Sequence, residues 1–298
     1  MIRSDADLTG MRRGFLVPPS PPLFGFTSGG ENSGTVLDTT ERFDNITNTQ
    51  TVRAPITPRE RLTGFSFNNF GFTSLGRDVT FSIVLGTTER LDDTANIQTG
   101  RLDDPTPRMF PAGYAFNNFG FTSGGETAGF GQLGTTERFD DIADSWTGRL
   151  GIIPRNDLAG YSFNNFGFTI CGSDGVNQRF DDTANTQTVR NSATTLSGPA
   201  GFAFNNFGFV SCGRDGTSTP VNTTQRFDDV ANTWTGRLGP TIRFDLTGYA
   251  FNNFGYTTCG EDAGFSALGT TERFDDTADS WTGRLDASPR YTLAGYAT

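Results

Sequence analysis

Arginine is the side chain whose type and spacing in this sequence point most clearly to chemistry. A guanidinium is permanently charged, and its forked donors match the oxygens of carboxylate and phosphate groups. Five arginines stand at one place in a repeated sequence, and Leu196 takes that place in the remaining repeat. If they surround one mouth of a closed fold, they form a receptor for anionic groups. The alternative is that each pairs with a nearby carboxylate, such as Asp157 or Asp245. The five are Arg59, Arg108, Arg155, Arg243 and Arg290.

Cysteine and aspartate offer two further kinds of chemistry. Cys171, Cys212 and Cys259 occupy one place in three successive repeats, and their spacing matches no metal-binding loop. We therefore expect buried, reduced thiols rather than a zinc or iron site, and a disulfide only if equivalent positions lie within about 7 Å. The acidic turns 140–144 and 275–279 could suit calcium. Because aspartate also favours tight turns by bonding its own backbone, we expect structural turns there.

Two side chains that perform much of the acid–base and metal chemistry of proteins are absent. The chain has 298 residues but no lysine and no histidine, so all 23 basic residues are arginine. Histidine general bases, Ser-His-Asp triads, histidine metal sites and Schiff-base lysines are therefore excluded. We assign no catalytic residue, metal site or cofactor, and we expect a protein that is not an enzyme.

Charge and hydropathy limit the partners. A net charge of −10 makes the chain a poor binder of nucleic acid or of an anionic membrane. No segment approaches the roughly 18 consecutive apolar residues of a membrane span, and residues 1–7 have no apolar core like that of a signal peptide. We expect other protein subunits as partners, with glycans as the alternative. We favour a virion or extracellular assembly over the cytoplasm.

The elements that must position these residues are six copies of one repeat. Gly-Phe-Thr or a close variant begins at Gly25, Gly71, Gly120, Gly167, Gly208 and Gly255, and Thr-Thr-Glu-Arg-Phe-Asp or a variant follows each. A period of this length indicates a repeat architecture. We therefore predict one domain, 1–298, with units near 14–61, 62–108, 109–155, 156–196, 197–243 and 244–290, and with 291–298 as a closing strand.

Each repeat reads as four short strands. In the third unit, 112–116 alternates large and small residues, and Asn117-Asn118 supplies a two-residue turn because asparagine tolerates a positive φ. The further strands are 119–123, 136–139 and 145–150. Four antiparallel strands repeated six times predict an all-β, six-bladed propeller. The 29 phenylalanines are then needed to pack the faces of neighbouring blades.

The repeat resembles the kelch repeat. The residues that carry this resemblance in one unit are Pro107, Arg108, Tyr114, Phe116, Asn117, Phe121, Gly124, Gly125, Phe139 and Trp146. Two positions depart from the kelch pattern. The first glycine of the pair is Leu75, Cys171, Cys212 or Cys259 in four units, and the tryptophan is Gln50, Gln98 or Gln187 in three. The resemblance implies a propeller with a ring that the two chain ends close together.

The chain ends support closure within one molecule. Residues 293–298 repeat the first strand of a unit and then stop, whereas 17–22 is rich in proline where the first unit needs that strand. Because proline cannot donate to a sheet ladder, we expect 293–298 to pair beside 24–28. The alternative is that residues 8–16 fill this place and the tail pairs with another subunit.

The loops after the glycine pair differ most between repeats, and loops on a rigid scaffold commonly carry function. Phe81, Phe130 and Phe265 lie in these loops. We take them as candidate contacts for a partner, with folding back over the blades as the alternative.

Three classes of function remain, and we favour a non-catalytic structural or protein-interaction propeller. The repeats are near copies of one another, as in a duplicated scaffold, which suits a component of a larger assembly such as a phage virion or surface filament. A lectin-like carbohydrate-binding module is the alternative, because aromatic side chains can stack on sugars. The kelch resemblance also implies a sugar isomerase as a second alternative; the copper oxidases of similar fold need histidines that are absent.

Overall fold

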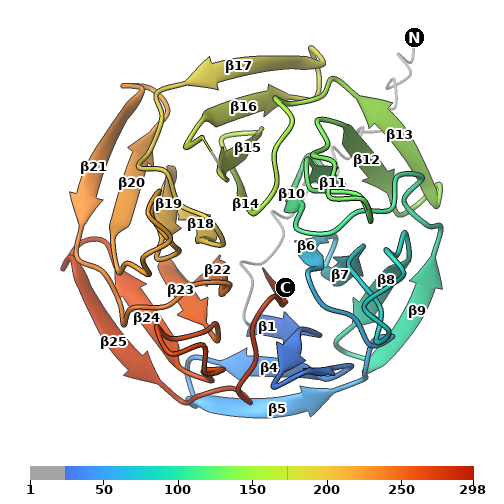
Figure 1. Cartoon of the computed structure of the whole chain (residues 1–298), viewed down its shortest axis with the longest axis horizontal. Helices are drawn as coiled ribbons and strands as arrows, with labels where there is room; N and C mark the ends of the chain where they lie inside the picture. Colours follow the sequence, from blue (N-terminus) through green and yellow to red (C-terminus); the bar gives the residue numbers. More distant parts are fainter. Residues whose placement is uncertain (1–23, 173) are drawn as a thin grey trace, which may run out of the picture.

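Six four-stranded antiparallel sheets are arranged as blades around a central axis (Figure 1). The computed structural model describes residues 24–172 and 174–298, and their regular secondary structure is entirely β. The six-bladed propeller predicted from the repeats is confirmed. The described residues include no helix of the length and apolarity needed to cross a bilayer.

The innermost strand of each blade lies next to the axis and begins three or four residues after the repeated arginine or Leu196. Its second or third residue is a glycine, and each such glycine lies close to the neighbouring inner strand. A Cβ on Gly160 would stand 2.5 Å from the carbonyl oxygen of Gly113, so a side chain there would push the inner strands apart. The inner strands are β26 (Ala294–Ala297), β6 (Thr63–Phe67), β10 (Ala112–Phe116), β14 (Leu158–Phe163), β18 (Ala200–Phe204) and β22 (Thr247–Phe251).

The first blade is completed by the C-terminal strand. β26 pairs antiparallel with β1 (Phe24–Ser28), with Gly25 opposite Ala297 and Ser28 opposite Ala294. The predicted closure of the ring within one chain is therefore confirmed. The alternative partner for this place, residues 8–16, lies outside the described residues.

The Asn-Asn turns join the first and second strands in the five blades whose hairpin is continuous in sequence. Asn117 and Asn118 have φ values of 52° and 62°, the left-handed conformations that a type I′ hairpin turn requires. The second strands are β1, β7 (Phe70–Ser74), β11 (Phe119–Ser123), β15 (Phe166–Cys171), β19 (Phe207–Ser211) and β23 (Phe254–Thr258). A small hairpin of β2 (Glu31–Asn32) and β3 (Thr35–Val36) follows β1.

The third and fourth strands carry each blade to the outside of the ring. The third strands are β4 (Thr40–Asp44), β8 (Thr88–Asp92), β12 (Thr136–Asp140), β16 (Asn177–Asp181), β20 (Thr224–Asp228) and β24 (Thr271–Asp275). The fourth strands are β5 (Thr49–Arg53), β9 (Ile97–Arg101), β13 (Ser145–Arg149), β17 (Thr186–Arg190), β21 (Thr233–Arg237) and β25 (Ser280–Arg284). The acidic turns between them are built as expected, since Asp140 Oδ1 accepts the N–H groups of Ile142 and Ala143.

Aromatic rings fill the space between blades. The rings of Phe67 and Phe72 stack with centroids 4.6 Å apart, and Phe72 meets Phe139 of the next blade edge-on at 5.6 Å. The glycine of each Gly-Phe-Thr phrase makes room for this packing. A Cβ on Gly71 would stand 2.0 Å from Cε2 of Tyr296, which belongs to the preceding blade. The Gly-Phe-Thr phrase therefore recurs because each blade needs a glycine where the aromatic ring of the neighbouring blade packs.

Tryptophan and glutamine form the same interblade hydrogen bond at the outer edge of the ring. Trp146 Nε1 donates to the Leu102 carbonyl of the preceding blade at 2.9 Å, and Gln98 Nε2 donates to the Ala54 carbonyl at 3.4 Å. The blades with glutamine thus keep the interblade hydrogen bond but lack the indole ring.

Candidate functional site

The five repeated arginines are fully buried, with 0% of each side chain exposed. Each donates to a carboxylate of the blade that it precedes, and four of these carboxylates are the glutamate of the Thr-Glu-Arg phrase. The Nη2–Oε distance is 2.7 Å for Arg59 and Glu89. A receptor at the mouth requires exposed guanidiniums, so the five do not form one; internal ion pairing, the alternative, is what the geometry supports. The other pairs are Arg108–Glu137, Arg155–Asp174, Arg243–Glu272 and Arg290–Glu41.

Charge balance is kept where the repeat departs from this pattern. The fifth blade has Leu196 in place of the arginine and Gln225 in place of the glutamate, so it buries neither charge. In the fourth blade, Gln178 replaces the glutamate and Arg155 pairs instead with Asp174 at 3.2 Å. An unpaired charge buried at this depth would cost several kcal/mol, so the arginine and its carboxylate act as one structural unit.

The three cysteines are buried free thiols. Each Sγ–H points to a backbone carbonyl, for example that of Thr241 at 3.6 Å from Cys212 Sγ. Burial raises the pKa of Cys171 to about 12 and the pKa values of Cys212 and Cys259 to about 11. A thiol with so high a pKa stays protonated at neutral pH and is a poor nucleophile.

A cavity of about 540 Å³ lies at one mouth of the axis. We call it the mouth cavity. Its wall includes residues from several units that share one position, two residues after the repeated arginine or Leu196, and the residue type at this position differs between units. These residues are Arg61, Phe110, Asp157, Asp245 and Thr292, with Gly198 at the same place just below in the fifth unit. The residue after the glycine pair contributes a second set, which includes Glu31, Arg77, Arg214 and Glu261.

Backbone hydrogen bonds between blades fix this ring of residues. The N–H of Phe110 donates to the carbonyl of Arg61 at 2.9 Å, and the N–H of Arg61 donates to the carbonyl of Thr292 at 2.7 Å. The N–H of Thr292 donates to the carbonyl of Asp245, and the N–H of Asp245 donates to the carbonyl of Gly198, both at 2.9 Å. All six residues have φ between 52° and 60°. Non-glycine residues rarely adopt this left-handed conformation and do so mainly where the surrounding structure enforces it.

Asp157 and Asp245 lie in the mouth cavity without an ion-pair partner within 4 Å among the described residues. Asp157 Oδ2 accepts a hydrogen bond from Ser197 Oγ at 2.9 Å. Burial, reinforced by the charge of Asp157, raises the pKa of Asp245 to about 7. Burial also raises the pKa of Asp157, and Arg61 and Arg214 only partly oppose this effect. The two carboxylates therefore form an acidic pair that no cation contacts within ion-pair distance in the described part of the chain.

A second acidic pair consists of Glu31, which lines the mouth cavity, and Glu60 beside it. Glu60 is buried and accepts from Arg77 Nε at 2.7 Å. Burial and a hydrogen bond with Glu31 raise the pKa of Glu60 to about 7. Burial acts to raise the pKa of Glu31, but hydrogen bonds with Glu60, Tyr291 and the Gly34 N–H outweigh burial and lower this pKa overall. Glu60 is thus the member of this pair that holds a proton near neutral pH.

The cavity arginines are occupied by protein groups. Arg61 lies over the ring of Phe110 with 4.5 Å from its guanidinium carbon to the centroid, and Arg214 lies over Phe244 at 3.5 Å. Arg77 pairs with Glu60 and also lies 5.0 Å from the ring centroid of Phe81. Each of these arginines thus contacts an aromatic ring or a carboxylate, whereas Asp157 and Asp245 have no cation within 4 Å among the described residues.

The three loop phenylalanines predicted as contacts have different surroundings. Phe81 lines the mouth cavity. Phe265 packs on Phe244, with centroids 5.9 Å apart, and Phe130 is 70% exposed. Each has a positive φ and donates its N–H to the carbonyl three residues earlier, which places the ring at the tip of a tight turn. The structure therefore brings Phe81 to the cavity and leaves Phe130 outside it.

Sequence reasoning missed most of the mouth cavity. It followed the residues that recur, whereas the cavity is lined by residues that change from unit to unit at fixed places. The two residues directly after the repeated arginine differ between units, for example Glu60-Arg61, Asn156-Asp157 and Phe244-Asp245. The residue after the glycine pair differs as well, for example Arg77, Arg214 and Glu261. Variation inside an otherwise constant frame was the available signal.

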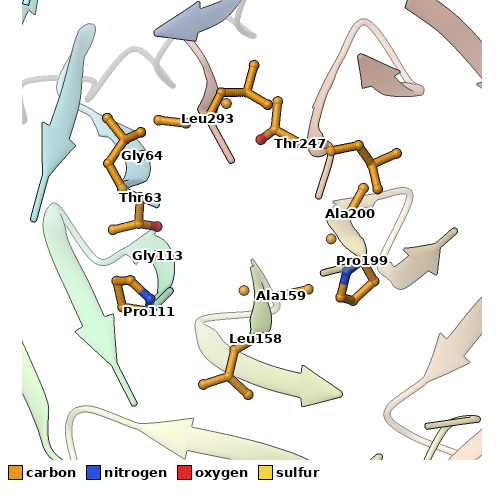
Figure 2. Close-up of a pocket in the computed structure, with 17 residues that line it drawn as sticks. Thr63, Gly64, Pro111, Gly113, Leu158, Ala159, Pro199, Ala200, Thr247 and Leu293 are labelled. Atoms are coloured by element: carbon orange, nitrogen blue, oxygen red, sulfur yellow. The ribbon is translucent and has the colours of Figure 1, made fainter. Parts of the chain in front are cut away.

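The axis narrows below the mouth cavity. Figure 2 shows side chains from the starts of successive inner strands and from the residues directly before them, around a central space of about 90 Å³; they include Thr63, Pro111, Leu158, Pro199, Thr247 and Leu293. Beyond it, a cavity of about 180 Å³ at the opposite mouth is lined by inner-strand residues such as Phe65 and Tyr249. The mouth cavity is the larger and more charged of the two openings.

A scan against protein-family models finds no match to this chain, and a search of curated proteins finds none either. The architecture is nevertheless plain: the chain is a six-bladed β-propeller, and a β-propeller suggests a protein-interaction scaffold.

Proposed function

We propose that this protein is a non-catalytic interaction propeller that binds a cationic side chain of a protein partner in the mouth cavity. The observation that carries the proposal is the pair Asp157 and Asp245, two enclosed carboxylates without an ion-pair partner among the described residues. A guanidinium or ammonium group between them would relieve their mutual repulsion and supply the missing donors.

The surroundings of the pair support a side chain as ligand. The volume of about 540 Å³ accommodates an arginine or lysine side chain together with part of its backbone. Phe110 and Tyr291 border the cavity and offer aromatic surface to an aliphatic stem or to a guanidinium face. Interblade backbone hydrogen bonds hold Asp245 in place before binding, and the Ser197 hydroxyl holds the Asp157 carboxylate, which reduces the entropy lost on association.

We further propose that the propeller belongs to the kelch-repeat family and is a component of a larger assembly, such as a phage virion or surface filament. The spaced kelch-like residues support the first statement, together with the six blades and the closure by the C-terminal strand. The near identity of the repeats and the pairing of the five buried arginines with carboxylates support a rigid scaffold role.

Calorimetry with blocked peptides tests the proposed function. We expect a blocked Gly-Arg-Gly peptide to bind, a Gly-Glu-Gly peptide not to bind, and Asp157→Asn with Asp245→Asn to weaken binding by about tenfold or more. Asp103→Asn is the matched control, because Asp103 is exposed and outside the cavity. Binding of the acidic peptide in preference to the basic one would reject the proposal.

A carbohydrate ligand is the second candidate, favoured by the presence of Phe81, Phe110 and Tyr291 beside carboxylates in one cavity. Aromatic faces and paired acceptors are suited to the apolar faces and hydroxyls of sugars. A glycan array with the parent protein and Phe110→Ala separates the two candidates: glycan binding that this substitution abolishes, without peptide binding, would favour a lectin. Turnover of a sugar substrate would instead favour the isomerase alternative.

A further inference from the structure

Five of the six junctions between blades are held by an aspartate that forms ion pairs with two arginines. At the junction of the first and second blades, Asp93 lies 3.0 Å from Arg42 Nη1 and 2.7 Å from Arg53 Nε. The aspartate belongs to the later blade, directly after its third strand, and the arginines come from the third and fourth strands of the earlier blade. The equivalent aspartates at the next four junctions are Asp141, Asp182, Asp229 and Asp276.

The sixth junction, where the last blade meets the first, has the arginines without the aspartate. Arg273 and Arg284 occupy the arginine positions, but Asn45 stands where the first blade should supply the carboxylate. Within the described part of the chain, neither arginine has a carboxylate oxygen within 4.0 Å. We call Asn45, Arg273 and Arg284 the seam cluster.

The blades at this junction are nonetheless in contact. Leu285 N–H donates to Asn48 Oδ1 at 2.9 Å, and Gln50 Nε2 donates to the Leu285 carbonyl at 3.3 Å. These bonds reproduce the ones that other junctions make, such as Leu238 N–H to Asp279 Oδ1. The missing ion pair therefore reflects the substitution at residue 45 and not a gap between the blades.

The seam cluster holds donors in place for an anion. Arg273 is fixed over the ring of Phe254, with 4.1 Å from its guanidinium carbon to the centroid. Burial and the neighbouring charge of Arg273 lower the pKa of Arg284, as expected of two cations that share a site without a counter-ion. Asn45 Oδ1 is buried without a hydrogen-bond donor. An amide rotated by 180° would present Nδ2 instead, and the cluster would then offer donors from three side chains.

We propose that the seam cluster binds a small oxyanion of the phosphate or carboxylate class, which takes the place of the missing aspartate and completes the ring of interblade ion pairs. Two arginines and an amide can bind such a group by charge-assisted hydrogen bonds. An aspartate at residue 45 would exclude the anion by repulsion, and asparagine removes that repulsion while keeping the size of the side chain. Anion binding at the junction that closes the ring would stabilise the closed propeller by linkage.

The experiment compares thermal unfolding of the full-length protein with and without millimolar inorganic phosphate, at constant ionic strength set with chloride. We expect phosphate to raise the Tm by about 2 to 4 °C. Asn45→Asp should raise the Tm in the absence of phosphate and abolish the phosphate effect. Acetate in place of phosphate tests whether a carboxylate serves as well.

Asp93→Asn provides the matched control, because it reproduces the seam cluster at the first junction. It should lower the Tm in chloride and gain a second phosphate-dependent increase, and calorimetry should find one phosphate in the parent protein and two in this variant. General stabilisation by excluded anions would appear equally in every variant. An equal phosphate effect in Asn45→Asp and the parent, or no phosphate effect in the parent, would overturn the proposal.

Discussion

Gly198 lies so close to Asp245 that a Cβ on the glycine would stand 2.1 Å from Asp245 Oδ1. Gly198 has the same left-handed φ as its five counterparts in the ring around the mouth, but it is the one that carries no side chain. The absence of a side chain therefore gives the Asp245 carboxylate its position.

Gly198→Ala should lower stability and displace this carboxylate. An L residue at φ +60° costs about 1 kcal/mol relative to glycine, and the clash with Asp245 adds to that cost. We expect a lower Tm and weaker binding of the Gly-Arg-Gly peptide. Gly216→Ala is the control, because no atom lies within 4 Å of a Cβ there. Equal effects of the two substitutions would contradict this account of Gly198.

Stability should fall as the pH rises from about 5 to 8. Burial raises the pKa values of Asp245 and Glu60 to about 7 in the folded protein, whereas in the unfolded chain they titrate near 3.8 and 4.5. Between these values the folded state holds more protons, so the stability present at low pH is lost as the pH rises through the folded pKa. The Tm measured from pH 5 to 8 should decline in the parent and decline less in Asp245→Asn. A Tm that rises over this range would show that other groups dominate.

Breaking one internal arginine pair should be more damaging than removing it entirely. Arg243→Leu leaves Glu272 partly buried without its cation, and we expect a loss of about 3 kcal/mol or more. Adding Glu272→Gln should recover much of that loss, because the pair then copies Leu196 and Gln225 of the fifth blade. Gln225 Oε1 already accepts the Thr194 N–H, as Glu272 accepts the Thr241 N–H. Urea unfolding of both variants gives the comparison, and a double variant weaker than Arg243→Leu would contradict the argument.

Removing residues 294–298 should open the ring. The deletion exposes the hydrogen-bonding edge of β1 and the packing surface of Tyr296. An exposed edge invites association, so we expect a lower Tm and larger species in light scattering. Tyr296→Phe is the control, since it removes only the hydroxyl bonded to Ser28 and keeps the strand. An unchanged Tm and a monomeric deletion variant would refute intramolecular closure as a source of stability.

The fold could be predicted from the sequence because its local rules repeat. The Asn-Asn turns, the alternation of large and small residues and the C-terminal half-hairpin each have a direct geometric meaning, and the strands of the third unit fall at 112–116, 119–123, 136–140 and 145–149. Only the ends of the outer strands differ from the prediction, by a residue at most. Such agreement reflects short strands joined by turns with specific backbone demands.

The candidate site could not be predicted in the same way. The repeated arginines look like site residues in sequence, but their partners are carboxylates distant in sequence that only the folded blade brings into contact; for Arg59 and Arg243 they are glutamates about 30 residues later. Asp157 and Asp245 are 88 residues apart, yet the charge of Asp157 helps to raise the pKa of Asp245 at the same mouth. Charge placement across blades depends on which places face the axis, and the linear sequence does not show that orientation.

The axis of the propeller has two openings, and a small central space lies between them. Glycines on the inner strands bring the six blades together so closely that the space between the mouths shrinks to about 90 Å³. A larger, charged cavity lies on one side of this space, and a smaller opening lined by inner-strand residues such as Phe65 and Tyr249 lies on the other. The two ends of the axis therefore differ in chemistry: one presents charged side chains, and the other presents aromatic rings and backbone.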